Sequence, residues 1–277
     1  MQLEKRVEQN YNHGSLEQTI LAALIAAGKD PEKLTAADLV PVDEFHIGGR
    51  EATIDLAQRM GVTKGMRVLD IGAGLGGASR YFAGELGCDV TGIDLTEAYV
   101  RTAEALTRRV GLAARINYQH GSALDLPFAT AAFDAAYMIH VGMNIEDKAR
   151  AFAEFRRVLA PGGVLGIYDV MREQPGELGF PVPWASDAAA SFLETAETYR
   201  SLLEGAGFEV SATLSRRDFA IAVFERMSAD IARNGGAPPP LGLHILIGAT
   251  AREKSVNLLD LLRRGVVAPT VIVARAV

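Results

Sequence analysis

The sequence predicts an α/β fold with a mostly parallel, doubly wound sheet, and three observations support this prediction. Short apolar or β-branched runs recur at residues 66–71, 88–93, 115–119, 133–139 and 164–170. Segments with helical spacing of apolar residues separate most of these runs, and a glycine-rich turn follows the first. Strands that alternate with helices favour parallel pairing, with helices on both faces of the sheet.

Two of the intervening segments have one apolar face each. After Thr96, a residue suited to capping a helix, apolar residues recur every three or four positions from Tyr99 to Val110. A second stripe runs from Phe152 to Leu159. We expect Pro161-Gly162-Gly163 to end that helix before the next strand.

The ends of the chain lie outside this rhythm. Residues 1–65 are expected to be helical, with Ser15, Thr35 and Asp43 as candidate caps and Pro31 and Pro41 as breaks. Residues 171–194 form a loop rich in proline, glycine and aromatic side chains. A helix over 191–205, a strand from Gly207 and a last strand over 268–274 follow, with a turn or stiff linker at 234–240.

These patterns divide the chain into three parts. Residues 1–50 form a helical N-terminal cap or lid, and residues 51–215 form the sheet domain, which includes the cap loop 171–194. Residues 216–277 add a helical insertion and the final strand of the sheet.

Composition excludes several classes of protein. The 277 residues carry a net charge of −6 without a Lys/Arg-rich run, which disfavours a nucleic-acid partner. A single cysteine, Cys88, rules out an intrachain disulfide and a Cys-rich metal site, and we expect no metal. The N-terminus lacks a signal-peptide pattern, and the apolar run 20–27 is too short to insert into a membrane. We expect a cytoplasmic protein, and its assembly into a homo-oligomer is left open.

The strongest local signal is the segment 68–77, where a strand leads into a glycine-rich turn that begins a helix. Gly72, Gly74 and Gly76 remove Cβ atoms where a ligand must approach the backbone, and the N–H groups at the helix start face that ligand. The second strand ends at Asp94, whose carboxylate can accept hydrogen bonds from both hydroxyls of a ribose. The pair predicts a nucleoside-containing ligand.

The spacing Gly72-x-Gly74-x-x-Gly77 also fits a dinucleotide fingerprint, so an NAD(P)-dependent dehydrogenase has to be considered. Asp70 precedes the turn, where its negative charge would repel a pyrophosphate and attract the ammonium group of an amino acid. A ligand with an amino acid part is therefore favoured.

Five segments in order now identify a resemblance: VLDIGAGLGG (68–77), GIDLT (92–96), GSALDLPF (121–128), FDAAYMIHVGMNI (133–145) and RVLAPGGVLGIYD (157–169). Over roughly residues 43–215 the chain resembles class I S-adenosylmethionine-dependent methyltransferases of the ubiquinone/menaquinone-biosynthesis type. The resemblance implies a Rossmann-like, seven-stranded sheet and S-adenosylmethionine as the cofactor.

The resemblance also implies roles for residues along the carboxyl edge of the sheet. Gly72, Ala73 and Gly74 would lie against the methionine part of the cofactor, with Asp70 nearby, and Asp94 would hold the ribose. The remaining contacts are Leu95 beside the adenine, Ser122 and Ala123 at its edge, and Ile139 and His140 near the sulfonium. Ser122 departs from the family, which usually has Asp at this position, so the bond to the adenine amino group would be weaker.

Residues 43–53, DEFHIGGREAT, resemble a subgroup that includes sarcosine and dimethylglycine N-methyltransferases. Phe45, His46 and Gly48 would then belong to a lid that contacts the cofactor. The alternative for Gly48 and Gly49 is that they form a flexible start of the following helix. The acceptor is expected to be a small molecule, for example an amine such as a glycine derivative. The alternative is O- or C-methylation of a small hydroxylated or quinone-like metabolite.

The chemistry of the acceptor decides which side chains are needed. A neutral amine requires little beyond alignment, whereas a hydroxyl or carbon acid requires a general base. His140 is the best candidate, with a cofactor-contacting or structural role equally open. Tyr11 and His13 could line the acceptor pocket, and Asn144 could orient the acceptor or cap the following helix.

Two further points stay open at this stage. Phe180 and Trp184 could form an aromatic wall for a methylated ammonium or could pack the cap. A binding or assembly protein that keeps the fold without turnover is the remaining class, although the intact glycines and Asp94 argue against it.

Overall fold

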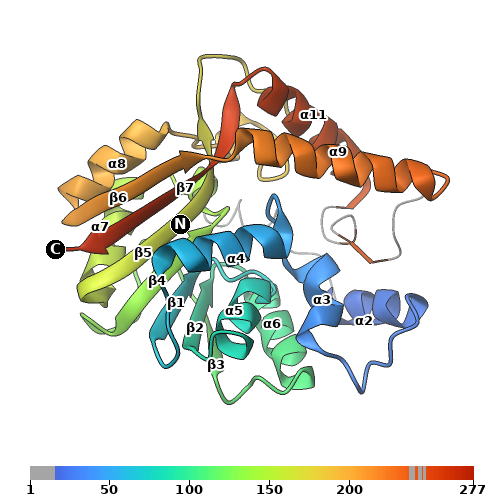
Figure 1. Cartoon of the computed structure of the whole chain (residues 1–277), viewed down its shortest axis with the longest axis horizontal. Helices are drawn as coiled ribbons and strands as arrows, with labels where there is room; N and C mark the ends of the chain where they lie inside the picture. The colour runs from blue at the N-terminus through green and yellow to red at the C-terminus, as the bar shows by residue number, and fades with distance from the viewer. Residues whose placement is uncertain (1–15, 237–240, 243–244, 246–247) are drawn as a thin grey trace.

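The computed structural model describes residues 16–236, 241–242, 245 and 248–277 (Figure 1). Within them, seven strands form one sheet in the order β3-β2-β1-β4-β5-β7-β6. The strands are β1 (Arg67–Ile71), β2 (Asp89–Asp94), β3 (Ile116–His120), β4 (Phe133–Ile139), β5 (Leu159–Arg172), β6 (Phe208–Ser215) and β7 (Val267–Ala276). Pairing is parallel from β3 to β5, and β7 pairs antiparallel with both β5 and β6. The predicted mostly parallel α/β sheet is confirmed.

Helices cover both faces of the sheet (Figure 1). On one face, α4 (Gly49–Met60) and α5 (Gly77–Gly84) pack an apolar layer against β1, β2, β4 and β5. On the other, α7 (Lys148–Val158) and α8 (Ala196–Gly205) pack a second layer that contains Phe152 and Phe155. The buried stripe predicted between residues 152 and 159 is therefore one of the two cores. Helix α6 (Glu97–Arg109) lies beside β2 and β3, as the spacing after Thr96 predicts.

Two N-terminal helices reach the glycine-rich turn from outside the sheet. Helix α2 (Leu16–Ala26) packs on α6, and α3 (Ala36–Asp43) packs on α5. Thr35 caps α3 as predicted, and its backbone N–H donates to Asp38 Oδ2 at 2.9 Å. Pro41, predicted to break a helix, instead lies inside α3. It forfeits one backbone bond close to the helix end, which so short a helix tolerates. Asp43, predicted as a cap, is instead the last residue of α3 and forms an ion pair described below.

Several predicted boundaries move by a few residues. Strand β5 starts at Leu159, because the chain becomes extended directly after α7 and carries Pro161-Gly162-Gly163 into the strand. Helix α8 begins at Ala196 and not at Ser191, since the Thr195 side chain caps it by accepting from Thr198 N. The last strand extends beyond the predicted range 268–274 at both ends.

A cap lies over the carboxyl edge of β4 and β5. It comprises the loop 173–195, which contains η2 (Ala188–Ala190), with α9 (Arg217–Arg233), η3 (Gly248–Thr250) and α11 (Ala251–Arg263) (Figure 1). A group of apolar side chains, termed the cap cluster, joins these elements to two other segments. One is the lid loop, residues 44–48 between α3 and α4, and the other is η1 (Gly142–Asn144) after β4. Its members include Ile47, Met143, Trp184, Leu258, Leu261 and Leu262. Among the described residues, no helix is both long and apolar enough to span a bilayer.

Candidate active site

The glycine-rich turn joins β1 to α5 in a conformation that requires glycine. Gly72, Gly74 and Gly76 have φ angles of +77°, +53° and +81°, in the left-handed region that other residues rarely adopt. A Cβ on Gly72 would lie 2.2 Å from Val141 Cγ2. The turn therefore packs closely against the segment that follows β4. Its backbone is accessible to a ligand only because the three glycines have no side chains.

Asp94 is fixed by the turn that it faces. Its Oδ2 accepts from Gly74 N at 2.8 Å, and its Oδ1 accepts from Thr96 N at 2.8 Å. Each carboxylate oxygen has a further lone pair, so two hydroxyl donors can still be accepted. This arrangement suits a ribose that lies beside the glycine turn.

Asp70 is buried at the end of β1, where it is 3% exposed and accepts a 2.6 Å hydrogen bond from Ser79 Oγ. Burial raises the pKa of its carboxyl to about 7. A cation close by would favour the ionised form and lower that pKa. The carboxyl is therefore suited to a position near the ammonium group of an amino acid.

The lid loop between α3 and α4 lies directly on the glycine turn. A Cβ on Gly74 would come within 3.0 Å of Phe45 Cζ, so the Phe45 ring covers the turn. Gly48, with a φ of +88°, caps α4 from the left-handed region, and a Cβ there would be 2.5 Å from the ring of Phe219. Gly48 thus permits close contact between the lid and α9.

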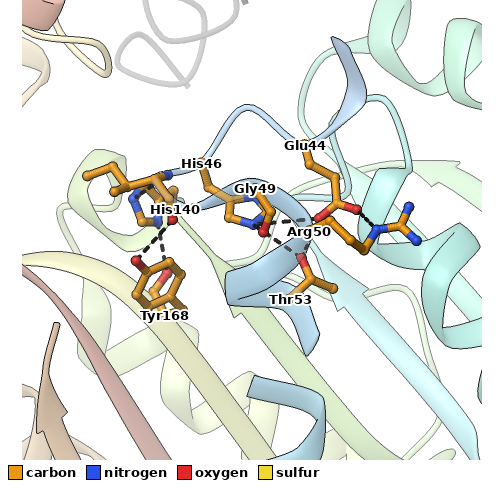
Figure 2. A network of polar contacts seen from close by, with 8 residues as sticks. Glu44, His46, Gly49, Arg50, Thr53, His140 and Tyr168 are labelled. Carbon is orange, nitrogen blue, oxygen red and sulfur yellow. Dashed lines mark hydrogen bonds and ion pairs between the residues drawn. The ribbon is translucent and has the colours of Figure 1, made fainter. Parts of the chain in front are cut away.

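Both backbone polar groups of Ile47, in the middle of the lid loop, bind side chains of Tyr168 and His140, which are labelled in Figure 2. The Tyr168 hydroxyl donates to Ile47 O at 3.0 Å, and Ile47 N donates to His140 Nε2 at 3.4 Å. We call this pair of contacts the Ile47 latch. Tyr168 belongs to β5 and His140 follows β4, so the latch joins the lid to the carboxyl edge of the two central strands.

The contacts of His140 define its protonation. Its Nδ1 lies 3.1 Å from Tyr168 O, and because a carbonyl only accepts, Nδ1 carries the hydrogen while Nε2 accepts from Ile47. Burial, together with the smaller effect of nearby His46, lowers the pKa of this imidazole to about 3. A neutral imidazole whose acceptor nitrogen is occupied is a weak base at neutral pH. These contacts therefore argue against the general-base role expected for His140.

A polar network at the start of α4 holds the other half of the lid (Figure 2). The buried Glu44 carboxylate accepts from Arg50 Nε and from the Thr53 hydroxyl. His46 Nε2 lies 3.0 Å from Gly49 O, which requires its hydrogen to be on Nε2. Burial lowers the pKa of His46 to about 4. His46 is therefore neutral and holds the turn into α4.

A buried ion pair connects α3 to α5. Arg80 Nη2 donates to Asp43 Oδ2 at 2.6 Å, and the side chains of both residues are 0% exposed. Arg80 also donates to Leu75 O in the glycine turn at 2.6 Å and to Thr107 Oγ1 at 2.9 Å. One guanidinium thus binds the N-terminal helices and the turn at the same time.

Part of this chain resembles known proteins. Residues 69–167 match the family model described as a methyltransferase domain. Over these residues the chain is similar to a methyltransferase domain. The match agrees with the expected enzyme class, an S-adenosylmethionine-dependent methyltransferase, and with its expected cofactor. The ubiquinone/menaquinone subgroup stays a prediction.

The proteins that resemble this chain are methyltransferases of several kinds. An O-methyltransferase, cnsE of Penicillium expansum, is 31% identical over 182 residues, which are 66% of this chain and 63% of that protein. The chain thus spans less than two thirds of that relative. A structure assigned as a sarcosine dimethylglycine methyltransferase from Galdieria sulphuraria has a TM-score of 0.66 at 22% identity, covering 81% of this chain and 84% of that one. A geranyl diphosphate C-methyltransferase from Streptomyces coelicolor has a TM-score of 0.71 at 16% identity, covering 100% and 99%.

Other predicted site residues of this chain make structural contacts. The Asn144 amide donates to Trp184 O at 2.9 Å and to Ala190 O at 2.8 Å, which anchors the cap loop. Trp184 is 1% exposed and its Nε1 donates to Ser191 Oγ, so packing of the cap explains it better than an aromatic wall. Ser122 Oγ accepts from Leu124 N at 3.1 Å, within the turn after β3.

Three other predicted residues, Tyr11, His13 and Ser15, lie outside the described residues. The structure adds Glu44, Arg80 and Tyr168, which sequence reasoning missed. The sequence around these three residues does not indicate their roles, because each side chain binds a residue that lies 5 to 121 positions away in the chain.

Proposed function

We propose that this protein transfers the methyl group of S-adenosylmethionine to a small molecule held between the carboxyl edge of the sheet and the cap. The observation that carries the proposal is the Ile47 latch, which fastens a lid across the strands that end beside the glycine turn. An enclosed site excludes water and aligns the reactants, and methyl transfer requires both.

The side chains at the turn fit the cofactor. Asp94 would accept from the ribose hydroxyls, and the backbone of Gly72 to Gly74 would lie along the methionine part. Asp70 would favour the ammonium group, and Leu95, Ser122 and Ala123 would surround the adenine. When bound, S-adenosylmethionine supplies a methyl carbon that its sulfonium already activates.

Among possible acceptors, a neutral amine such as a glycine derivative fits these side chains best. The nitrogen lone pair would form the new bond to carbon while the sulfur–carbon bond breaks and leaves its electron pair on sulfur. The proton of the product ammonium would then pass to water. Burial keeps His46 and His140 neutral by lowering their pKa values to about 4 and about 3, so neither is suited to deprotonate a hydroxyl.

Within this function, His140 and Tyr168 would act as positioning residues. Ile139 is the last residue of β4 and His140 follows it, and the family resemblance implies that both lie near the sulfonium. The role of His140 and Tyr168 would be to keep the lid closed during transfer. O- or C-methylation stays the alternative, and it applies to an acceptor that arrives already ionised.

Two measurements test the proposal. Titration calorimetry should detect S-adenosylhomocysteine binding and no NAD(H) binding, and saturating ligand at a hundredfold its Kd should add about 2.7 kcal/mol of stability. A screen of small amines, phenols and carbon acids should then release S-adenosylhomocysteine with at least one class. If the protein modifies only macromolecules, the enclosed acceptor site is refuted.

A further inference from the structure

A buried pair of polar side chains lies beneath η1, the short helix that follows β4. Asp169 in β5 and Tyr199 in α8 are both 0% exposed, and the Tyr199 hydroxyl donates to Asp169 Oδ2 at 2.6 Å. The backbone N–H of Val170 donates to Asp169 Oδ1 at 3.1 Å, and the N–H of Met143 in η1 faces the same carboxyl. The pair is therefore enclosed by β5, α8 and η1.

Helix η1 lies directly on this pair. A Cβ on Gly142 would be 2.3 Å from Asp169 Oδ2 and 2.5 Å from the Tyr199 hydroxyl oxygen, so no side chain fits at that position. Because η1 covers the carboxyl, movement of η1 away from β5 would admit water to it. The position of η1 and the hydration of Asp169 are therefore coupled.

Helix η1 in turn holds the cap loop, residues 173–195. The Asn144 amide anchors the loop, as described above, and Phe192 N donates to Met143 O at 2.8 Å. Lys148, the first residue of α7, donates from its Nζ to Phe192 O at 2.6 Å. A displacement of η1 would therefore also release the cap loop.

The charged groups around the pair leave an ionised Asp169 poorly compensated. Lys148 Nζ lies 5.6 Å from the centre of the Tyr199 ring and favours the ionised carboxyl, whereas Glu194 of the cap loop faces both Lys148 and Tyr199. Helix η1 has no titratable side chain. Burial outweighs the effect of Lys148 and raises the pKa of Asp169 to about 7. A buried carboxylate is unfavourable unless it is fully paired.

We propose that Asp169 and Tyr199 are positioning residues for the acceptor site, because they hold η1 and, through it, the cap loop, which is released when Asp169 ionises. This inference rests on the proposed function, which places the acceptor beneath the cap. Release brings the carboxylate into water, where its pKa returns towards the ordinary value of 3.8. The closed loop is therefore most stable at low pH and loses stability as the pH rises from about 4 to about 7.

Hydrogen exchange at the Phe192 amide, followed by NMR, measures this release, since that N–H binds Met143 O. The ratio of exchange rates between the wild type and Asp169→Asn at one pH cancels the intrinsic pH dependence of exchange. That ratio should rise at least about tenfold from pH 5 to pH 7, because the amide of the variant cannot ionise. A ratio that is constant with pH would overturn the proposal.

Trp184, the one tryptophan of the chain, provides a second readout from within the cap loop, where it is 1% exposed. Tyr199→Phe removes the hydroxyl that donates to Asp169, which weakens the hold on η1. Acrylamide should therefore quench Trp184 fluorescence at least about twofold more efficiently in this variant than in the wild type.

Ser79→Ala is the matched control for Tyr199→Phe. It also removes a hydroxyl that donates to a buried carboxyl at 2.6 Å, but that carboxyl, Asp70, lies at the end of β1 and not beneath η1. Quenching of Trp184 should not change in Ser79→Ala, and equal quenching in the two variants would overturn the proposal. Both readouts work without cofactor, so failure of the proposed function is separate and would appear as absent S-adenosylhomocysteine binding by the wild type.

Discussion

The Asp43–Arg80 ion pair provides the sharpest test of how the N-terminal helices are held. Asp43→Asn keeps the shape of the side chain and removes its charge, which leaves the Arg80 guanidinium with only neutral acceptors. Because both side chains are 0% exposed, we expect a loss of about 3–5 kcal/mol in the free energy of unfolding. That is a large part of the stability of an ordinary protein, about 5–15 kcal/mol.

A matched control comes from the surface of the same chain. Arg67 pairs with Asp134 at 2.7 Å, but the two side chains are 51% and 35% exposed, so Asp134→Asn should cost at most about 1 kcal/mol. Urea unfolding followed by circular dichroism measures both variants. A similar cost for the two would refute the view that burial makes the Asp43 pair essential.

The same variant links stability to the site. Arg80 also donates to Leu75 O in the glycine turn, so loss of its partner should loosen the turn. We expect weaker S-adenosylhomocysteine binding by Asp43→Asn in calorimetry at a temperature where it remains folded, and unchanged binding by Asp134→Asn.

Four further predictions concern the cofactor, the lid and the pH dependence of stability. Asp94→Ala should stay folded and bind S-adenosylhomocysteine at least about tenfold more weakly in calorimetry, because it removes a charged acceptor of hydrogen bonds from the ribose hydroxyls. Ser122→Asp should bind S-adenosylhomocysteine as well as the wild type does or better. A large loss of affinity would refute the assignment of Ser122 to the adenine edge. Tyr168→Phe should speed S-adenosylhomocysteine release in stopped-flow experiments by about 2- to 10-fold, since it deletes one neutral hydrogen bond of the Ile47 latch, and an unchanged rate would mean that the latch does not limit release. The pKa of His46 is lowered from about 6.5 unfolded to about 4 folded, so its contribution to stability is complete above pH 6.5 and is lost as the pH falls towards 4. The stability difference between His46→Gln and wild type should therefore shift by about 2 kcal/mol in favour of the variant between pH 7 and pH 5, and parallel pH profiles in urea unfolding would contradict this. Burial raises the pKa values of Asp70 and of Asp169 in β5 to about 7, so their contributions to stability change with pH in the opposite direction. Both carboxyls are present in the wild type and in His46→Gln, so their effects cancel in the difference.

The sequence was sufficient where structure depends on local pattern. The glycine turn, Asp94 and the order of strands and helices all follow from residues close to one another in the chain. The helix boundaries near Ser191 and Pro41 did not, because side-chain caps and short helices override composition. An isolated proline signals a break, but it costs little when only one backbone bond is lost.

The site was less predictable where it depends on contacts between distant segments. His140 attracted a catalytic interpretation because it follows β4, yet its protonation depends on Ile47 and Tyr168, which lie in two other segments. No pattern in the sequence indicates that the backbone N–H of Ile47 faces the imidazole of His140. The same holds for Asn144, whose partners are carbonyl groups that any residue of the cap loop would supply.

The Ile47 latch uses backbone atoms on the lid side and side chains only on the sheet side. Any amino acid except proline supplies the same N–H and C=O at position 47, so the closure of the lid does not depend on which side chain stands there. The Ile47 side chain, by contrast, packs in the cap cluster. A substitution at this position can therefore change the packing of the cap cluster while the backbone contacts of the latch remain, so that cap packing and lid closure can evolve separately at one residue.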